Sequence, residues 1–211
     1  MTQQRERERL RVAGICGSIR KGSYTRMALA LALAGAGEAG AQTELIDLRD
    51  DRMIFCDGKE DESDYPKDVF KLREAARRAQ GIILATPEYH GGYSGVLKNA
   101  LDLMGFEEFE GKMLGLVGVS GGRMGASGAM HSLRDVGRAL HAWVIPEQAS
   151  VPQAWQVFDE QGHCKDDETL KRLKQVGRQV VRFASLHTAE KAGEFLREYE
   201  SAVENPGGEN P

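Results

Sequence analysis

The sequence predicts an α/β protein with a doubly wound parallel sheet of five strands and helices on both faces. Short apolar segments alternate five times with longer segments whose apolar residues recur every three or four positions, as in strand–helix repeats. The apolar run Gly81–Thr86 is uninterrupted, which is typical of a central strand covered on both faces. No internal repeat or change in composition divides the 211 residues, so one principal domain is expected.

The first strand is expected at Arg11–Gly17 and the first helix at Gly22–Ala39. Leucines alternate at positions 29, 31 and 33, which alone would fit a strand, but the alanines interleaved with them favour a helix. Gly37 and Gly40 then end this helix, because glycine is common just beyond a helical C-terminus. A second strand follows at Thr43–Leu48.

Arg49–Tyr65 is an acidic stretch that interrupts the alternation and is expected to form a long surface loop. Loops of this length in compact domains are often lids or binding loops. A solvated connector is the alternative, and it is slightly favoured for most of this stretch.

The remaining elements continue the alternation. Strands are expected at Gly81–Thr86, Met113–Val119 and Trp143–Val151. One helix is opened by Asp64 and Pro66 and runs to Ala79. Further helices are expected at Ser94–Met104, at Ser127–Leu140 and from Asp167 to about Leu186. The helices carry apolar residues on one face, and Ser94 is a favourable N-cap. Pro146 suits an edge position for the last strand, because proline has no N–H to donate to a neighbouring strand.

Three regions are therefore expected along the chain: a polar N-terminal extension at residues 1–10, the α/β domain at residues 11–190, and the end of the last helix with a tail at residues 191–211. The tail from Glu204 to Pro211 is rich in Pro, Gly and Asn and is expected to be disordered.

Composition excludes several classes of function. The net charge of -4 and pI near 5.8 argue against non-specific nucleic-acid binding. No apolar run approaches the ~20 residues of a membrane span, and the charged segment Met1–Arg11 lacks the apolar core of a secretory signal. The three cysteines are few and far apart, which indicates a reducing cytoplasm. No Cys or His spacing typical of a metal site occurs, so no metal is expected.

The stretch Gly14–Thr25 carries the clearest chemical signal, because a strand there turns straight into a helix. A helix N-terminus offers free N–H groups to an anion, and hydroxyl and guanidinium donors strengthen such a site. The turn supplies these donors from Ser18, Arg20, Ser23 and Thr25. Neither a Walker A motif nor the dinucleotide fingerprint is present, so a single phosphate monoester, as in FMN, fits better than a pyrophosphate. The alternative is an ordinary polar turn.

Two further loops follow the third and fourth strands. Thr86–Gly95 combines Pro87 with glycines that allow a planar group to approach, and Tyr89 and His90 could stack on a flavin ring. In doubly wound sheets, ligands bind at the carboxyl ends of the strands where the strand order reverses. This loop and the loops after the first and fourth strands are therefore expected to form one site. The alternatives are a core-anchoring role for Tyr89 and a solvent-facing His90.

The loop Ser120–Gly128 has three glycines within five residues, which again permits a close approach of the backbone to a ligand. Arg123 could place positive charge near a flavin edge or a nicotinamide phosphate. An exposed turn arginine is an equally good interpretation of that residue.

Together these motifs resemble the NADPH-dependent FMN reductase family of flavodoxin-like proteins, which includes chromate, quinone and azo-dye reductases. The similar segments are Gly17–Ser23, Thr86–His90, Ser120–Arg123 and the helix sequence Gly95–Asp102, within a resemblance that spans about Arg11–Val151. The resemblance implies a flavodoxin-like fold and an FMN-binding domain over residues 11–190.

The resemblance also implies roles by position. The residues placed around the FMN phosphate are Ser18, Arg20, Ser23, Tyr24 and Thr25. Those that line the isoalloxazine or lie beside its edge are Pro87, Glu88, Tyr89, His90, Gly91, Ser120, Gly121, Gly122 and Arg123. Many relatives carry Asn where this chain has His90, which is bulkier and can titrate.

The function that the resemblance implies is that of a cytoplasmic flavoenzyme. Bound FMN would take a hydride from NADPH or NADH and pass electrons to a small acceptor such as a quinone, free flavin, azo dye, chromate or ferric iron. The cofactor carries this chemistry, so no catalytic side chain is expected. Two alternatives stay open: a flavodoxin-like carrier that docks a protein partner, which the mild net charge disfavours, and a redox-sensing flavin-binding protein with little turnover.

A homodimer or homotetramer is expected, with the flavin site near a subunit boundary. Val96 and Leu103 lie off the core face of the helix Ser94–Met104, and two aromatics follow in an expected loop at Gly105–Phe109. Closed two-fold symmetry commonly covers such a surface, and the family's members are typically dimers or tetramers. The alternative is that Arg49–Tyr65 folds over this patch within one chain.

Overall fold

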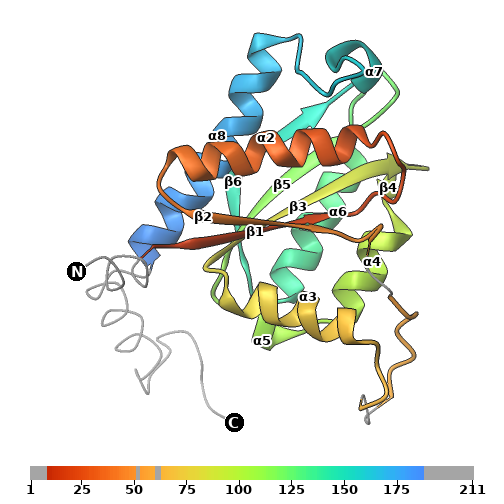
Figure 1. The fold of residues 1–211 in the computed structure, drawn as a ribbon, viewed down its shortest axis with the longest axis vertical. Helices are drawn as coiled ribbons and strands as arrows, with labels where there is room; N and C mark the ends of the chain where they lie inside the picture. The colour runs from red at the N-terminus through yellow and green to blue at the C-terminus, as the bar shows by residue number, and fades with distance from the viewer. Residues whose placement is uncertain (1–8, 51–52, 60–62, 188–211) are drawn as a thin grey trace, which may run out of the picture.

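A computed structural model of the chain describes residues 9–50, 53–59 and 63–187. Five parallel strands form the sheet in the order β2-β1-β3-β5-β6 (Figure 1). Their bounds are β1 Arg11–Cys16, β2 Gln42–Asp47, β3 Gly81–Tyr89, β5 Met113–Val119 and β6 Trp143–Val151. The two-residue strand β4, Gly92–Tyr93, pairs antiparallel with the end of β3. The N-terminal extension and the tail after residue 190 lie outside the described residues, apart from positions 9 and 10.

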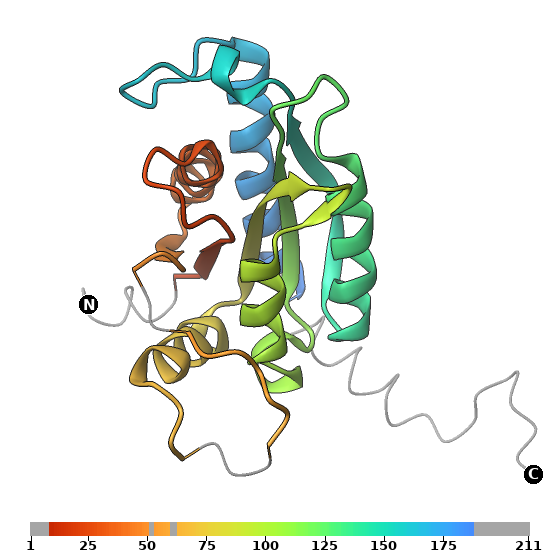
Figure 2. The same ribbon diagram turned by 90° about the vertical axis from the view of Figure 1, so that its right-hand side faces the viewer.

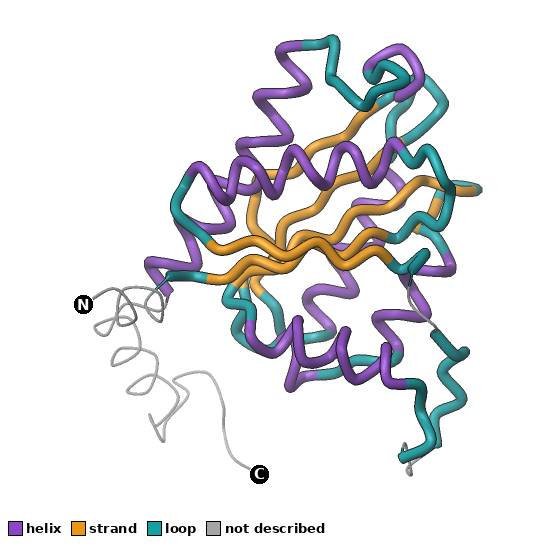
Figure 3. The backbone as a smooth tube through the Cα atoms, viewed as in Figure 1, coloured by secondary structure: helices purple, strands orange, loops and turns teal. Residues whose placement is uncertain are grey.

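The helices cover both faces of the sheet, which confirms the expected doubly wound arrangement (Figures 2 and 3). On one face lie α2 (Tyr24–Glu38) and α8 (Asp167–His187), and on the other lie α3 (Lys67–Arg78), α4 (Gly95–Asp102) and α6 (Ser127–Ala139). Side chains alternate along β3, so Ile83 packs beneath α2 and α8 while Ile82 and Leu84 pack beneath the other three helices. Among the described residues, every helix is too short or too polar to span a lipid bilayer.

The strand order reverses between β1 and β3. The chain leaves β1 through α2 to reach β2 on one side, then returns through α3 on the opposite face to β3 on the other side. The connections that follow β1 and β3 therefore diverge from neighbouring strand ends. This divergence creates the crevice in which ligands of doubly wound sheets bind.

The sequence predicted the bounds of β5 and β6 correctly, and β6 is an edge strand as expected from Pro146. The pairing of β6 with β5 shifts register between Leu114 and Leu116. At this irregularity the guanidinium of Arg134 donates hydrogen bonds to the carbonyl oxygens of Ile145 at 3.2 Å and Pro146 at 3.0 Å.

Three short elements were not predicted. Residues Pro87–Tyr89, expected as a loop, continue β3 and fold back through β4 as a hairpin. Gly105–Phe109, expected as a loop with two exposed aromatics, forms the short helix α5 (Phe106–Phe109), and its Phe109 is fully buried. Another short helix, α7 (Ala154–Val157), follows β6 directly.

The long connection after β2 contains no helix or strand among its described residues, and it folds onto α4. Asn99 of α4 donates from its side-chain amide to the carbonyl of Ile54 at 2.7 Å and accepts from the N–H of Cys56 at 3.0 Å. Leu103, expected to need a partner outside the chain, is buried against Tyr65 and Val69. The covering of Leu103 within one chain, which was the alternative, is therefore what the structure shows.

Helices α2 and α8 approach one another so closely that their backbones are in contact. A β-carbon on Gly177 would collide with the carbonyl oxygen of Ala32, and one on Gly35 would collide with the carbonyl oxygen of Lys174. At the edge of this contact Glu38 accepts hydrogen bonds from Lys174 and Arg178, both at 2.6 Å, and these lower its pKa.

Replacement of Gly177 by alanine is expected to lower the free energy of unfolding by about 1–3 kcal/mol or more, because the two backbones must separate. Gly37 is the matched control, since it lies in α2 and a β-carbon added to it would have no other atom within 4 Å. Gly37→Ala should instead stabilise the protein by up to about 1 kcal/mol through helix propensity. Urea unfolding of both variants checks this, and equal effects would contradict the close packing.

Candidate functional site

The turn after β1 lies against the start of α4. A β-carbon on Gly17 would lie 2.7 Å from the β-carbon of Leu97, so only glycine fits there. The N–H of Gly17 donates to the carbonyl of Ala85 at 2.8 Å, and the hydroxyl of Ser94 donates to the carbonyl of Gly17 at 2.5 Å. The same hydroxyl accepts from the N–H of Leu97 at 3.1 Å and so caps α4.

Three hydroxyl residues predicted around a phosphate, Ser18, Ser23 and Thr25, are buried in this turn and the first turn of α2. Ser23 is the N-cap of α2, and its oxygen accepts from the N–H of Arg26 at 3.2 Å. A hydroxyl that accepts one hydrogen bond still has a proton to donate to an anion. The first turn of α2 carries no acidic residue, so the local charge suits an anionic ligand.

The other two residues predicted around the phosphate differ in their surroundings. Arg20 is exposed, and its guanidinium carbon lies 5.9 Å from the centre of the Tyr89 ring, which brings the first two loops together. Tyr24 stacks on Phe158 with ring centres 6.0 Å apart. The Tyr24 ring therefore packs against the segment after β6.

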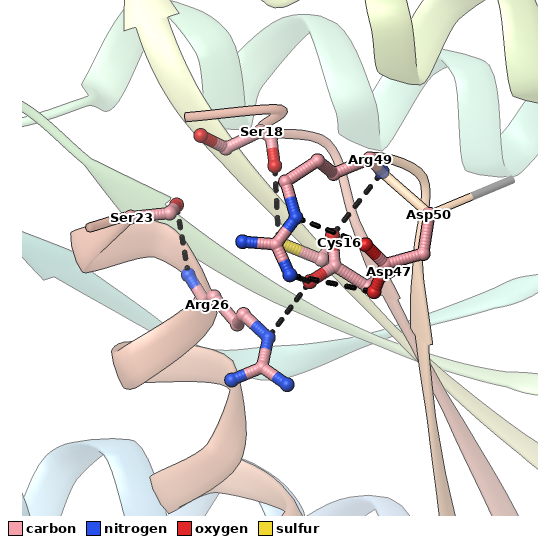
Figure 4. Close-up of polar contacts among 7 residues, drawn as sticks. All are labelled: Cys16, Ser18, Ser23, Arg26, Asp47, Arg49 and Asp50. Atoms are coloured by element: carbon pink, nitrogen blue, oxygen red, sulfur yellow. Dashed lines mark hydrogen bonds and ion pairs between the residues drawn. The ribbon is translucent and has the colours of Figure 1, made fainter. Parts of the chain in front are cut away.

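An ion-pair network that the sequence analysis missed joins this turn to the end of β2 (Figure 4). Asp47 has a nearly buried carboxylate that binds the Nε of Arg26 at 2.7 Å and the backbone N–H of Arg49 at 3.2 Å. Arg49 also binds Asp50 at 3.1 Å. The pairing of Arg26 with Asp47 spans 21 residues, so no local spacing could have indicated it.

Cys16 lies beneath this network, at the end of β1, and its Sγ contacts the carbonyl oxygen of Ser18 at 3.8 Å (Figure 4). Burial raises the pKa of the Cys16 thiol to about 11. The thiol is therefore protonated at neutral pH, and it packs within the hydrophobic core.

The hairpin after β3 rests on the first turn of α6. Glu88 accepts a hydrogen bond from the N–H of Ala129 at 3.0 Å, so its carboxylate caps a helix that has no side-chain cap at its own N-cap residue. A β-carbon on Gly128 would collide with the carbonyl oxygen of Gly91. Glu88, expected beside the isoalloxazine, thus has a structural role that holds the second and third loops together.

His90 and Gly91 form the tip of this hairpin, with φ of 53° and 79°. A two-residue hairpin turn with two positive φ angles favours Asn-Gly, and His is one of the few other residue types enriched in this conformation. The backbone conformation of His90 at this exposed position therefore suits either Asn or His.

The third loop is held by backbone hydrogen bonds to the end of β6 and to the turn that follows it. The N–H of Ser120 donates to the carbonyl of Val151 at 2.9 Å, and the N–H of Gln153 donates to the carbonyl of Gly122 at 3.1 Å. Gly121, Gly122 and Arg123 are exposed. The turn at Gln153, which no sequence motif indicated, is thus bound to the third of the three predicted loops.

Comparison with known proteins decides the family. A family model described as NADPH-dependent FMN reductase matches residues 10–156. The chain belongs to this family. It is an oxidoreductase of flavodoxin-like fold, with FMN as cofactor and NAD(P)H as co-substrate.

Two curated relatives are similar over most of the chain. An NAD(P)H-dependent FMN reductase of Pseudomonas aeruginosa is 35% identical over 175 residues, which cover 79% of this chain and 90% of the relative. An FMN-dependent NADPH-azoreductase of Staphylococcus aureus is 32% identical over 149 residues, covering 68% of this chain and 79% of the relative.

The fold is also similar to solved structures. The NAD(P)H:acceptor oxidoreductase FerB of Paracoccus denitrificans superposes with a TM-score of 0.69 at 24% identity, covering 84% of this chain and 98% of that one. An archaeal flavodoxin superposes with a TM-score of 0.59 at 13% identity, covering 83% of this chain and 99% of that one. At these identities the likeness concerns the fold.

The residues at the carboxyl ends of β1, β3 and β5 fit FMN. Buried hydroxyls and a helix N-terminus without acidic residues suit its phosphate, and exposed backbone at Gly121 and Gly122 suits the approach of a flat ring. Within the described residues, no three His, Cys, Asp or Glu side chains converge in a way that could hold a metal ion.

Ser94→Ala is expected to lower the free energy of unfolding by about 1–3 kcal/mol, because it removes a helix cap and the hydrogen bond to Gly17. Ser127→Ala is the control, since Ser127 is an exposed first residue of α6. It should change the stability by no more than about 0.5 kcal/mol. Urea unfolding measures the free energy of unfolding of both variants. An equal loss in the two would show that the Ser94–Gly17 contact does not stabilise the protein.

Proposed function

We propose that the turn after β1 binds the phosphate of FMN. The N-terminus of α2 and the hydroxyls of Ser18, Ser23 and Thr25 would donate hydrogen bonds to it, and the exposed Arg20 would close over it from solvent. The burial of these hydroxyls beside a helix start free of acidic residues is the observation that carries this proposal. The ring of Tyr24 would border the site.

The isoalloxazine ring would lie between the hairpin after β3 and the loop after β5. Pro87, Tyr89, His90 and Gly91 would border it on one side, and Ser120, Gly121, Gly122 and Arg123 would lie beside its polar edge. Glu88 would act indirectly by keeping the hairpin fixed to α6, as its hydrogen bond to Ala129 supports.

The activity that this arrangement supports is electron transfer from NAD(P)H to a small acceptor such as a quinone, free flavin, azo dye, chromate or ferric iron. When bound, FMN supplies the redox chemistry between hydride donor and acceptor. The chain would bind and orient the ring, and the chemistry requires no acid or base from the protein. Exposed apolar side chains in the segments that follow β1, β3, β5 and β6 support a flat organic acceptor, and they are Ile19, Tyr89, Met124 and Trp155.

The purified protein is expected to be yellow and to release FMN, and no FAD, on denaturation, because the turn after β1 offers one phosphate site. Chromatography of the released cofactor checks this. Steady-state assays of NADPH and NADH against each acceptor class should show turnover without a partner protein. Turnover that requires a protein partner would favour the electron-carrier alternative, and a protein that takes up no flavin would contradict the whole proposal.

Arg20→Ala is expected to weaken FMN binding by about tenfold to a hundredfold, because a charge-assisted hydrogen bond to phosphate contributes about 1.5–3 kcal/mol. Lys21→Ala, at the adjacent exposed position, should leave the dissociation constant within about threefold if only the guanidinium at position 20 reaches the phosphate. Titration of the apoprotein with FMN, followed by flavin fluorescence, measures both. An unchanged dissociation constant for Arg20→Ala would remove this residue from the site.

We further propose that the protein is cytoplasmic and forms a homodimer or homotetramer with the flavin site near a subunit boundary. The helix α4 does not support this assembly, since Leu103 is covered within the chain. Two other apolar side chains, Phe55 and Met124, support the assembly instead, because each is 88% exposed to solvent. Light scattering after size exclusion should give a mass of at least twice 23.2 kDa. A fully active monomer would contradict both the assembly and the shared site.

A further inference from the structure

The turn between β6 and α7 clamps the loop after β5 through its backbone. The N–H groups of Gln153 and Ala154 donate to the carbonyls of Gly122 and Ser120, both at 3.1 Å. The loop has only one hydrogen bond of its own among those described, from the N–H of Gly122 to the hydroxyl of Ser120 at 2.9 Å. Its shape therefore depends on the clamp.

Gln153 makes this clamp in a backbone conformation that glutamine rarely adopts. Its φ of 43° and ψ of 49° lie in the left-handed region, where a β-carbon crowds the following carbonyl oxygen. Only two other non-glycine residues among those described have positive φ: His90 in the hairpin turn, and His141 at the opposite end of the sheet. Strain of this kind persists only where the surrounding structure enforces it, and it concentrates at functional sites.

The conformation accounts for the clamp. In extended backbone, successive N–H groups point to opposite sides, whereas in the left-handed conformation the N–H groups of Gln153 and Ala154 point to the same side. Both can then reach carbonyls two residues apart in one loop. An extended residue at position 153 would lose at least one of these hydrogen bonds.

We propose that Gln153 is a positioning residue for FMN, which acts through its backbone by fixing the loop Ser120–Gly122 against the flavin edge. The proposal rests on the proposed function, which assigns that loop to the isoalloxazine. Gly121 and Gly122 would sample many conformations without the clamp, and FMN would then have to order them on binding. The clamp removes this entropic penalty before the cofactor arrives.

Three variants test the proposal. Gln153→Val places a β-branched residue where φ is positive and should open the turn, whereas Gln153→Gly should retain it at no steric penalty. His141→Val is the matched control, because it imposes the same strain far from the site. Titration of each apoprotein with FMN should show a dissociation constant at least tenfold higher for Gln153→Val and within twofold of wild type for the other two. The visible spectrum of bound flavin should change for Gln153→Val alone.

Each contrary outcome is informative. If Gln153→Gly weakens FMN binding as much as Gln153→Val, the effect belongs to the side chain. If His141→Val weakens FMN binding as much, the effect belongs to general instability. Either result overturns the proposal. Unchanged binding by Gln153→Val overturns it as well. Failure of the wild-type protein to bind FMN would instead overturn the proposed function itself.

Should Gln153→Val not fold, amide hydrogen exchange of the wild-type protein gives an independent test. The N–H groups of Gln153 and Ala154 should exchange slowly, and more slowly still when FMN is added, because the cofactor and the clamp stabilise the same loop. Exchange of these two amides at the rate of an open turn, or exchange insensitive to FMN, would overturn the proposal.

Discussion

The hydrogen bond from the Ser94 hydroxyl to the carbonyl of Gly17 is the contact on which the arrangement of the site depends. The strand order reverses between β1 and β3, so the connections after these strands run to opposite faces of the sheet. Ser94 joins them with a single hydroxyl that also caps α4. This contact requires that position 17 have no β-carbon. A glycine and a helix cap thus hold the turn after β1, the proposed phosphate site, against the start of α4, which follows the hairpin proposed to border the flavin.

The parts of the fold that the sequence predicted are those that depend on local patterns. The uninterrupted apolar run of β3, the N-cap at Ser94 and the edge position of β6 are each encoded by a few neighbouring residues. The grouping of the three loops also followed, because the carboxyl ends of parallel strands necessarily meet at one edge. The family resemblance then supplied the cofactor, which no local pattern names.

The features that the sequence did not predict are those that depend on contacts between distant residues. The carboxylate of Glu88 caps a helix 41 residues further along, and Arg26 pairs with an aspartate 21 residues away. The strand β3 also continues through Pro87 to Tyr89, beyond the apolar run that predicted its end at Thr86. The left-handed Gln153 carries no sequence signal at all, because glycine or asparagine would be expected in that conformation.

The irregular middle of β6 limits how two copies of this chain can meet. Open sheets extend most readily when their edge strands pair, and unprotected edges lead to aggregation. Here Pro146 has no N–H to offer, and the carbonyls of Ile145 and Pro146 are already occupied by Arg134. A neighbouring strand could not pair with this middle stretch of β6, so a sheet continuous across two molecules at this edge is disfavoured. Any assembly at this side of the molecule must be built from side chains, which lets the protein associate without exposing a template for fibres.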